Sequence, residues 1–138
     1  MPILTDMLKE QEGYVGHAYQ DSKGYWTIGY GRMIDERLGG HITKKEAEYL
    51  LENDIGRAEA ELNNSFSWFL CLPYNVQNGL INMNVNMGLP RLKTFKKMLL
   101  AISVGDYTEA AKQALDSKWR KDVGEDRALA VAKLIRNE

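Results

Sequence analysis

Hydrophobic and polar positions follow two different periods at the start of this chain. Near residues 3–12 the apolar residues, beginning with Ile3, recur at helical spacing, and Gly13 supplies a stop signal. Residues 17–32 instead combine glycines with aromatic and β-branched residues, divided by the turn sequence DSKG. The pattern predicts a short amphipathic helix followed by a hairpin with Asp21 at its turn.

Five later segments carry helical patterns. One helix is predicted to begin after Thr43, which forms a capping box with Glu46, and a second runs from Pro73 to Gly88. Apolar periodicity predicts further helices in TFKKMLLAI, GDYTEAAKQAL and GEDRALAVAKLI, and the middle one also opens with a capping box. The expected class is therefore α+β and mostly helical, with a small hairpin lobe, a C-terminal helical lobe and a cleft between them.

Length and composition agree with one domain. The 138 residues are 44% hydrophobic and 27% charged, which permits a sizeable core. We expect a single domain over residues 1–138, with an N-terminal lobe of about 1–62 and a C-terminal lobe of about 73–138. The single cysteine, Cys71, lies in the apolar run WFLCLP and is expected to be a buried, inert thiol.

Targeting signals and charge narrow the setting in which the chain works. The sequence has no apolar run of 18 residues and no basic region followed by an apolar one at its start, so neither stable membrane insertion nor a cleaved signal peptide is expected. Residues 1–90 carry a net charge of −5 and residues 91–138 carry +4. The basic half could approach an anionic polymer such as a cell wall or a nucleic acid, although uneven charge also arises by chance.

Two acids and a hydroxyl in the first segment suggest chemistry. Glu12 ends the predicted helix, Asp21 opens the turn, and Thr27 lies among aromatic residues and glycines. Glycoside hydrolysis needs one carboxyl that donates a proton and a second, ionised one that stabilises positive charge or activates water. Glu12 near packed apolar residues could be the acid, Asp21 the second carboxylate, and Thr27 could hold the water. Each residue taken alone is also ordinary on a protein surface.

The spacing of these residues resembles the T-even phage lysozymes. The segments EG at 12–13, YQDSKGYWTIGYG at 19–31 and ITKKEAEYLLENDI at 42–55 are similar to that family in order and spacing. Further likeness lies in NMNVNMG, GDYTEAA, SKW and DRA, so that the resemblance covers nearly the whole chain. It implies a lysozyme-like fold.

The resemblance also implies an activity. The family are endo-muramidases that cleave the β-1,4 bond between N-acetylmuramic acid and N-acetylglucosamine in peptidoglycan, with inversion and without a metal or organic cofactor. Glu12 matches the general acid, Asp21 the second carboxylate and Thr27 the threonine behind the nucleophilic water. Inversion implies carboxyl groups roughly 6.5–9.5 Å apart.

Supporting positions are implied by the same resemblance. Arg127 matches an arginine that approaches the acid, while Asn86 and Trp119 match positions of the cleft floor. Gln113 resembles an amide of the saccharide cleft, and Met33 is a further supporting position.

Several positions depart from the family. Arg32 replaces a histidine that pairs with an aspartate, here Asp54, which the helical pattern already places on an apolar face in need of a cation. A pair of Arg32 and Asp54 is therefore expected, without a histidine's pH sensitivity. Asn86 is shorter than the family's glutamine. Val85 and Met98 replace an aromatic residue and a serine at cleft positions.

Three other functions stay open on the sequence. A lytic transglycosylase would break the same bond with one glutamate, an inactive module would bind the wall only, and the basic segment RLKTFKK could contact nucleic acid. The matches at Asp21 and Thr27 favour the hydrolase. We therefore expect a monomer that acts on peptidoglycan and not on nucleic acid, made in the host cytoplasm and reaching the periplasmic wall after the membrane is permeabilised.

Overall fold

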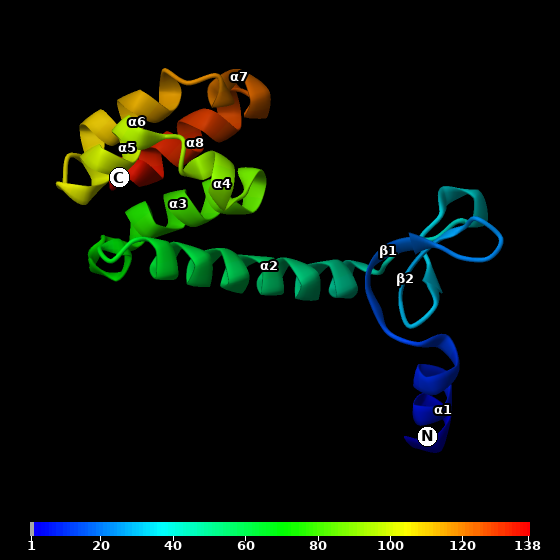
Figure 1. Ribbon diagram of the computed structural model, residues 1–138. Helices are drawn as coiled ribbons and strands as arrows, with labels where there is room; N and C mark the ends of the chain where they lie inside the picture. The colour runs from blue at the N-terminus through cyan, green and yellow to red at the C-terminus, as the bar shows by residue number, and fades with distance from the viewer. Residues whose placement is uncertain (1) are drawn as a thin grey trace. The chain divides into compact units, whose positions relative to one another are not determined.

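The computed structural model describes the backbone of residues 2–138 and the side chains of residues 4–138 (Figure 1). The chain divides into two compact units, an N-terminal unit (Met1–Ala47) and a C-terminal unit (Glu48–Glu138). Helices predominate and one small antiparallel sheet is present, so the predicted α+β class is confirmed. The described helices include none long and apolar enough to cross a membrane.

The N-terminal unit contains the predicted helix and hairpin. Gly13 ends the helix with a φ of +72°, and its N–H donates to the carbonyl of Lys9 at 2.9 Å. The side chain of Ile3, the first apolar residue of the pattern, lies outside the described residues. The hairpin gains a third short strand, which gives the strand order β1-β2-β3. The elements of this unit are α1 (Pro2–Glu12), β1 (Val15–Gln20), β2 (Trp26–Gly29), β3 (Arg32–Met33) and the 3₁₀ helix Glu36–Leu38, followed by the start of α2 (Lys44–Ser65).

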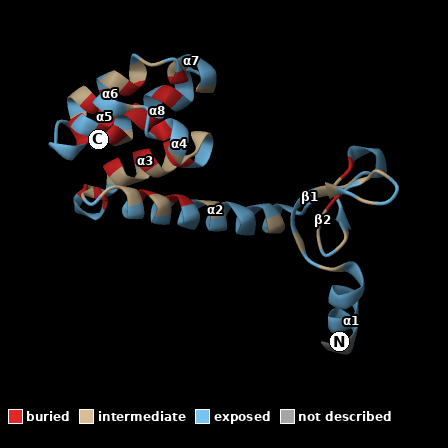
Figure 2. Cartoon of the chain, viewed as in Figure 1, coloured by how far each residue is buried: buried red, intermediate tan, exposed pale blue. Residues whose placement is uncertain are grey.

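The C-terminal unit is built around an apolar core. Its largest fully buried side chains include Trp119, Phe69, Leu80 and Ile102, and Figure 2 shows buried residues in red on the facing sides of its helices. The sequence pattern missed two short helices, α4 (Leu89–Leu92) and α7 (Trp119–Val123). After α2, the elements are the 3₁₀ helix Phe69–Cys71, α3 (Tyr74–Met87), α4 (Leu89–Leu92), α5 (Lys96–Ser103), α6 (Tyr107–Leu115), α7 (Trp119–Val123) and α8 (Glu125–Ile135).

The two predicted capping boxes differ in how completely they form. The N–H of Glu46 donates to the Thr43 hydroxyl at 3.1 Å and the N–H of Thr43 donates to the Glu46 carboxylate at 2.9 Å, which confirms that capping box. The second box forms only by half. Asp106 accepts from the N–H of Glu109 at 3.2 Å, but the Glu109 carboxylate accepts from Gln113 instead of closing the box.

The prediction of a buried thiol is wrong. Cys71 is exposed, because the chain forms a 3₁₀ helix over Phe69–Cys71, and this turn buries Phe69 while Leu70 is 62% exposed. Leu72, which follows, is buried again. Consecutive apolar residues on a helical turn face different directions, so a continuous apolar run does not place all its members inside.

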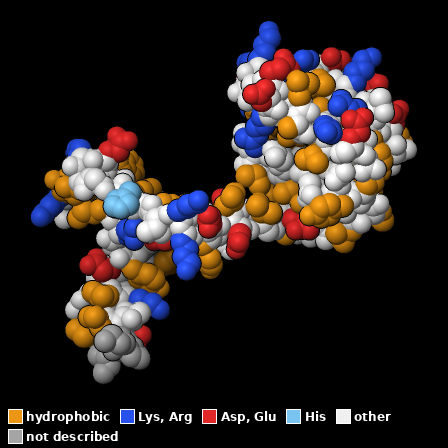
Figure 3. Space-filling model, turned by 180° about the vertical axis from the view of Figure 1, so that it is seen from behind, with side chains coloured by type: hydrophobic (Ala, Val, Ile, Leu, Met, Phe, Trp, Pro, Cys, Tyr) orange, Lys and Arg blue, Asp and Glu red, His pale blue; other side chains and the backbone are white. Residues whose placement is uncertain are grey.

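The boundary between the two units differs from the boundary between the predicted lobes, which places the N-terminal lobe at about residues 1–62. The division falls near the start of α2, and the later residues Ala58 and Leu62 are buried in the C-terminal unit. Leu50 and Leu51, in the earlier turns of the same helix, are each 51% exposed. Figure 3 shows apolar side chains, in orange, at the surface of both units.

Candidate active site

The predicted acid lies at the end of α1, next to a glycine of the sheet. A Cβ atom at Gly31 would collide with the carboxylate of Glu12, so this carboxylate occupies the space that only a glycine leaves open. Gly31 also has a φ of +71°, which favours glycine independently. The side chain of Glu12 is exposed. Within the N-terminal unit, apolar residues therefore do not bury this carboxylate, contrary to the expectation from the sequence.

Aromatic contacts fix the end of α1 against the same turn. The Lys9 ammonium lies 5.8 Å from the centroid of the Tyr30 ring, and the rings of Tyr14 and Tyr30 lie 5.7 Å apart. Lys9 and Glu12 are three residues apart and therefore share one face of the helix. Together they bring the end of α1 to the turn between β2 and β3.

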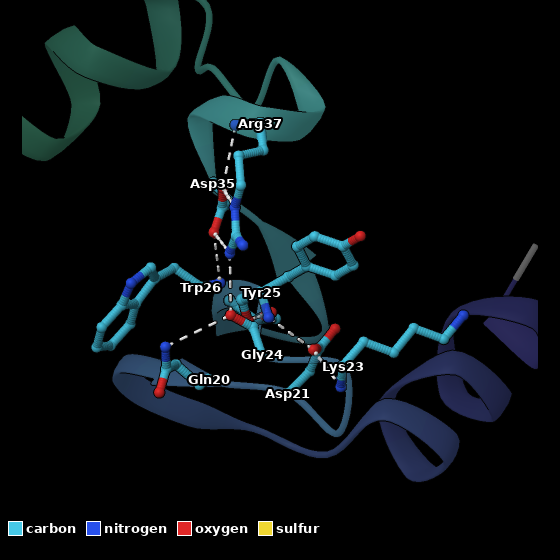
Figure 4. A network of polar contacts seen from close by, with 9 residues as sticks. Gln20, Asp21, Lys23, Gly24, Tyr25, Trp26, Asp35 and Arg37 are labelled. Atoms are coloured by element: carbon cyan, nitrogen blue, oxygen red, sulfur yellow. Dashed lines mark hydrogen bonds and ion pairs between the residues drawn. The ribbon is translucent and has the colours of Figure 1, made fainter.

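Asp21 is held by the turn that it opens. Its Oδ1 atom accepts from the backbone N–H groups of Lys23 and Tyr25, both at 2.9 Å, and its own carbonyl accepts from Gly24 (Figure 4). Such an Asx turn fixes the carboxylate to the backbone. No hydrogen bond of Oδ2 is found among the described residues, which leaves this oxygen for water or a ligand.

Thr27 lies in β2 and is one of the two residues buried in the N-terminal unit among those with described side chains. It pairs across the sheet with Tyr19 and Met33. Its hydroxyl donates to the carbonyl of Tyr25 at 3.1 Å. Because the hydroxyl hydrogen is used in this bond, its oxygen can accept a hydrogen bond from a water.

An acid and an arginine that the sequence analysis did not single out hold the Asp21 turn in place. The carboxylate of Asp35 accepts from Arg37 Nη2 at 2.6 Å and Nε at 2.8 Å, and from the backbone N–H of Trp26 at 3.2 Å. Arg37 also donates to the carbonyl of Gly24 at 3.1 Å and lies over the Tyr25 ring at 4.9 Å. Figure 4 shows how this clamp of Asp35 and Arg37 reaches the Asp21 turn.

The clamp shifts the pKa values of both of its members. The side-chain hydrogen bonds from Arg37 hold the pKa of the Asp35 carboxyl well below its usual value, backbone N–H donors add to this, and desolvation opposes it. Conversely, the bond to Asp35 raises the pKa of Arg37. The only sequence signal for the clamp is an acid two residues before an arginine in IDERLGG, and such spacing is common.

Arg32 and Asp54, which are expected to pair with each other, each contact other residues in the structure. Arg32 donates to the carbonyl of His41 at 2.8 Å and lies 3.5 Å from the Glu46 carboxylate. Asp54 pairs with Arg57 at 3.0 Å, and its side chain is 45% exposed. Asp54 is thus partly exposed to solvent and takes its cation from its own helix, at a spacing of three residues that the sequence pattern also offers.

The predicted supporting residues of the C-terminal unit fall at separate places. Arg127 donates to the Asn82 side chain at 2.9 Å and borders an apolar hollow of about 340 Å³. Gln113 and Trp119 line a different groove, of about 480 Å³, where the Gln113 amide donates to Glu109 at 2.8 Å. The Trp119 Nε1 atom is buried and has no hydrogen-bond partner in the described chain.

Other predicted positions differ in burial. Asn86 is exposed, whereas its neighbour Asn84 is buried and donates to the Ala58 carbonyl at 3.1 Å. Val85 is 38% exposed, and Met98 is 1% exposed within the core. In the N-terminal unit, Met33 is 43% exposed on β3, opposite Thr27.

Comparison with known proteins covers most of the chain. Residues 9–136 match the family described as phage lysozyme. An endolysin of Acyrthosiphon pisum secondary endosymbiont phage 1 is 32% identical over 115 residues, which are 83% of this chain and 75% of that protein. A probable T4-type lysozyme of Dictyostelium discoideum is also 32% identical, over 84% of each chain.

Proposed function

Since the chain belongs to the phage lysozyme family, we propose that it is an endo-muramidase that hydrolyses the β-1,4 bond between N-acetylmuramic acid and N-acetylglucosamine in peptidoglycan. One observation carries the assignment to these residues. Glu12, Asp21 and Thr27 lie in one compact unit, with the Glu12 carboxylate against Gly31, just beyond the strand that holds Thr27. Their order and spacing alone suggest the same chemistry.

The proposed reaction assigns one step to each group. Glu12 gives a proton to the oxygen of the leaving sugar as the bond from this oxygen to the anomeric carbon breaks. A water held by Thr27 attacks the anomeric carbon from the opposite side, and Asp21 takes the proton that the water loses. The product then has the inverted configuration, and both carboxyl groups recover in the exchange of protons with solvent.

The fixed geometry of the Asp21 turn supports this assignment. Two backbone N–H groups hold Oδ1, so the other carboxylate oxygen has a defined direction for receiving a proton. The clamp of Asp35 and Arg37 holds the opposite side of the turn through Gly24 and Tyr25. Positioning of this kind lowers an activation barrier because the geometry is set before the substrate binds.

The supporting roles of the C-terminal unit belong to the same proposal. Arg127, Asn86, Gln113 and Trp119 would contact substrate or orient the acid, as the resemblance implies. In biological terms we propose lysis of a host cell from within, in which the protein reaches the periplasmic wall once another agent has permeabilised the membrane. We also propose that it acts as a monomer.

The test compares the native chain with Glu12→Gln and Glu10→Gln on outer-membrane-permeabilised Gram-negative cells. The first change removes the transferable proton and should lower the release of reducing ends by about 10²- to 10⁴-fold. The second removes an exposed acid from the same helix and should leave the rate near native. Equal rates for the native chain and Glu12→Gln would refute the role of Glu12.

The products separate this activity from its alternatives. Hydrolysis yields a reducing N-acetylmuramic acid end, whose anomeric configuration is read by NMR immediately after cleavage, and inversion is expected. An anhydro product would identify a lytic transglycosylase. Binding to peptidoglycan without any release of sugar by the native chain would identify a binding module.

A further inference from the structure

A further hollow of the C-terminal unit, which the proposed reaction does not use, lies between α2 and the region where α3 ends and α4 begins. Its volume is about 260 Å³, and it will be called the amide hollow because the buried Asn84 lines it. Positions 54, 57, 58 and 61 of α2 recur at helical spacing and therefore form one wall. The other wall consists of residues 84, 85 and 88–90.

The side-chain amide of Asn84 is held in one orientation. Asn84 is 4% exposed, and its Nδ2 atom donates to the Ala58 carbonyl at 3.1 Å and to Glu61 Oε1 at 3.2 Å. Both amide hydrogens are thus used, and a flipped amide would direct its oxygen at two acceptors. The Oδ1 atom is buried and has no hydrogen-bond partner in the described chain. Because a buried acceptor without a donor destabilises a fold, this oxygen calls for a donor from outside the chain.

Two carboxylates of the α2 wall each keep one free oxygen. Glu61 accepts from Asn84 through Oε1, and Asp54 pairs with Arg57 through Oδ1 at 3.0 Å. No hydrogen bond or ion pair of Glu61 Oε2 or Asp54 Oδ2 is found among the described residues. Two carboxylates and one guanidinium give the lining a net charge of −1. The amide hollow therefore offers three acceptor oxygens and one excess negative charge to a cationic donor.

The number and arrangement of these oxygens decide which cation fits. A primary ammonium group carries one charge and three N–H donors, one for each free oxygen. Ca²⁺ and Mg²⁺ need about six or more oxygen ligands, and the guanidinium of Arg57 in the same lining repels a divalent ion. A guanidinium ligand prefers both oxygens of one carboxylate, but each carboxylate here already has one oxygen engaged. An ammonium group therefore fits best.

We propose that the amide hollow binds a primary ammonium group on an aliphatic stem, supplied by a free amine or by a lysine side chain. The ammonium donates to Asn84 Oδ1 and to the free oxygens of Glu61 and Asp54. Its stem lies along the apolar part of the lining, to which Leu89 and Pro90 contribute. No step of the proposed hydrolysis enters this inference, so it does not depend on the muramidase activity.

The experiment titrates the full chain with n-butylammonium and follows the backbone amide signal of Gly88, which lines the hollow, by NMR. N,N,N-trimethylbutylammonium serves as a second probe, with the same charge but no N–H donor. Asn84→Leu removes the free oxygen at similar volume, and Glu61→Gln removes one charge. The matched control Glu59→Gln removes an exposed acid of the same helix that does not line the hollow. Thermal unfolding checks that all variants are folded.

Asn84→Leu and Glu61→Gln should each weaken the binding of n-butylammonium by roughly tenfold, since each removes one hydrogen-bonding or charged partner of the ammonium. The control should stay within about twofold of native. The trimethylated probe should bind the native chain at least about tenfold more weakly than n-butylammonium. Equal binding of the two probes, or native affinity in both hollow variants, would overturn the proposal. Tighter binding of Ca²⁺ at the same signal would also overturn it, as would no shift at all, which would leave water as the partner of Oδ1.

Two further probes distinguish the sources of the ammonium group. Cadaverine represents a free amine, and the methylamide of Nα-acetyl-lysine represents a lysine side chain on a peptide backbone. Tighter binding of cadaverine would identify a small amine as the ligand, and tighter binding of the lysine derivative would identify a protein partner. Either order supports the amide hollow, provided that Asn84→Leu weakens both.

Discussion

The N-terminal unit and the C-terminal unit bury different kinds of side chain. Among residues 4–47, the buried ones are Thr27 and Asp35, both polar. The C-terminal unit buries a large set of apolar side chains, and Figure 2 shows this contrast in red. Hydrogen bonds and ion pairs depend on exact geometry, whereas apolar burial adds up over area. Polar burial in the N-terminal unit therefore serves to position its acids, whereas apolar burial in the C-terminal unit serves to stabilise the fold.

The largest effect should come from the apolar core. Leu80 is fully buried in α3, and Leu80→Ala should lower the free energy of unfolding of the C-terminal unit by about 2–5 kcal/mol because it removes apolar contacts and leaves a cavity. Leu100→Ala makes the same change where the side chain is 66% exposed and should cost less than about 0.5 kcal/mol. Urea unfolding measures both, and similar losses would show that apolar burial is not what stabilises the C-terminal unit.

The next effect concerns the space at Gly31. Gly31→Ala and Gly29→Ala both place a side chain at a φ near +70°, which should cost each variant about 1–2 kcal/mol. Only at Gly31 does the new Cβ meet the Glu12 carboxylate, since nothing lies within 4 Å of the corresponding atom at Gly29. Gly31→Ala should therefore also lower kcat by about 10- to 100-fold through a displaced acid.

Reducing-end release and urea unfolding of both variants test this prediction. We expect the two variants to have similar free energies of unfolding and Gly31→Ala to have the lower kcat. If both variants retain the same kcat, the contact between Glu12 and Gly31 has no part in catalysis.

A pH dependence should distinguish the clamp. Its partners keep the folded-state pKa of Asp35 below the ordinary value of 3.8. Asp35 therefore contributes stability that is present above about pH 4 and is lost as the pH falls below that value toward the lowered pKa. In Asp35→Asn the N-terminal unit should be less protected at neutral pH, and this acid-dependent loss should disappear.

Hydrogen exchange of the Trp26 amide, which donates to Asp35, measures the effect locally. Asp6→Asn changes an exposed acid of the same unit and should keep the native pH profile. A native profile for Asp35→Asn as well would show that the clamp does not control opening of the hairpin.

Features encoded by neighbours in sequence could be predicted, and contacts over long separations could not. Gly13, the Thr43–Glu46 box and the helix from Pro73 to Gly88 depend on local backbone chemistry, which the sequence displays directly. The contact of Glu12 with Gly31 and the reach of Arg37 to Gly24 join residues 19 and 13 positions apart. Neither leaves a spacing pattern.

Asp54 has a partner that the sequence also displays. Arg57 lies one turn further along the same helix, whereas the resemblance implies Arg32, and the pair of Asp54 with Arg32 stays a prediction. The candidate acids themselves were found because their order and spacing carried the signal, and the Asx turn at Asp21 was readable in DSKG. What supports those acids, above all Asp35, Arg37 and Gly31, became visible only in the folded hairpin.

The smallest effect should come from the exposed pair of Asp54 and Arg57. Their side chains are 45% and 69% exposed, so solvent screens the interaction, and Arg57→Gln should cost no more than about 0.5 kcal/mol and less still in high salt. A double-mutant cycle of Asp54→Asn with Arg57→Gln should give a coupling of about 0.2–0.5 kcal/mol. The parallel cycle of Asp54→Asn with Arg32→Gln should give a smaller coupling energy, because Arg32 donates to the His41 carbonyl and pairs with Glu46. A larger coupling of Asp54 to Arg32 than to Arg57 would support the pair that the resemblance implies, and it would show that the exposed Arg32, unlike Arg37 of the clamp, pairs with an acid far away in sequence.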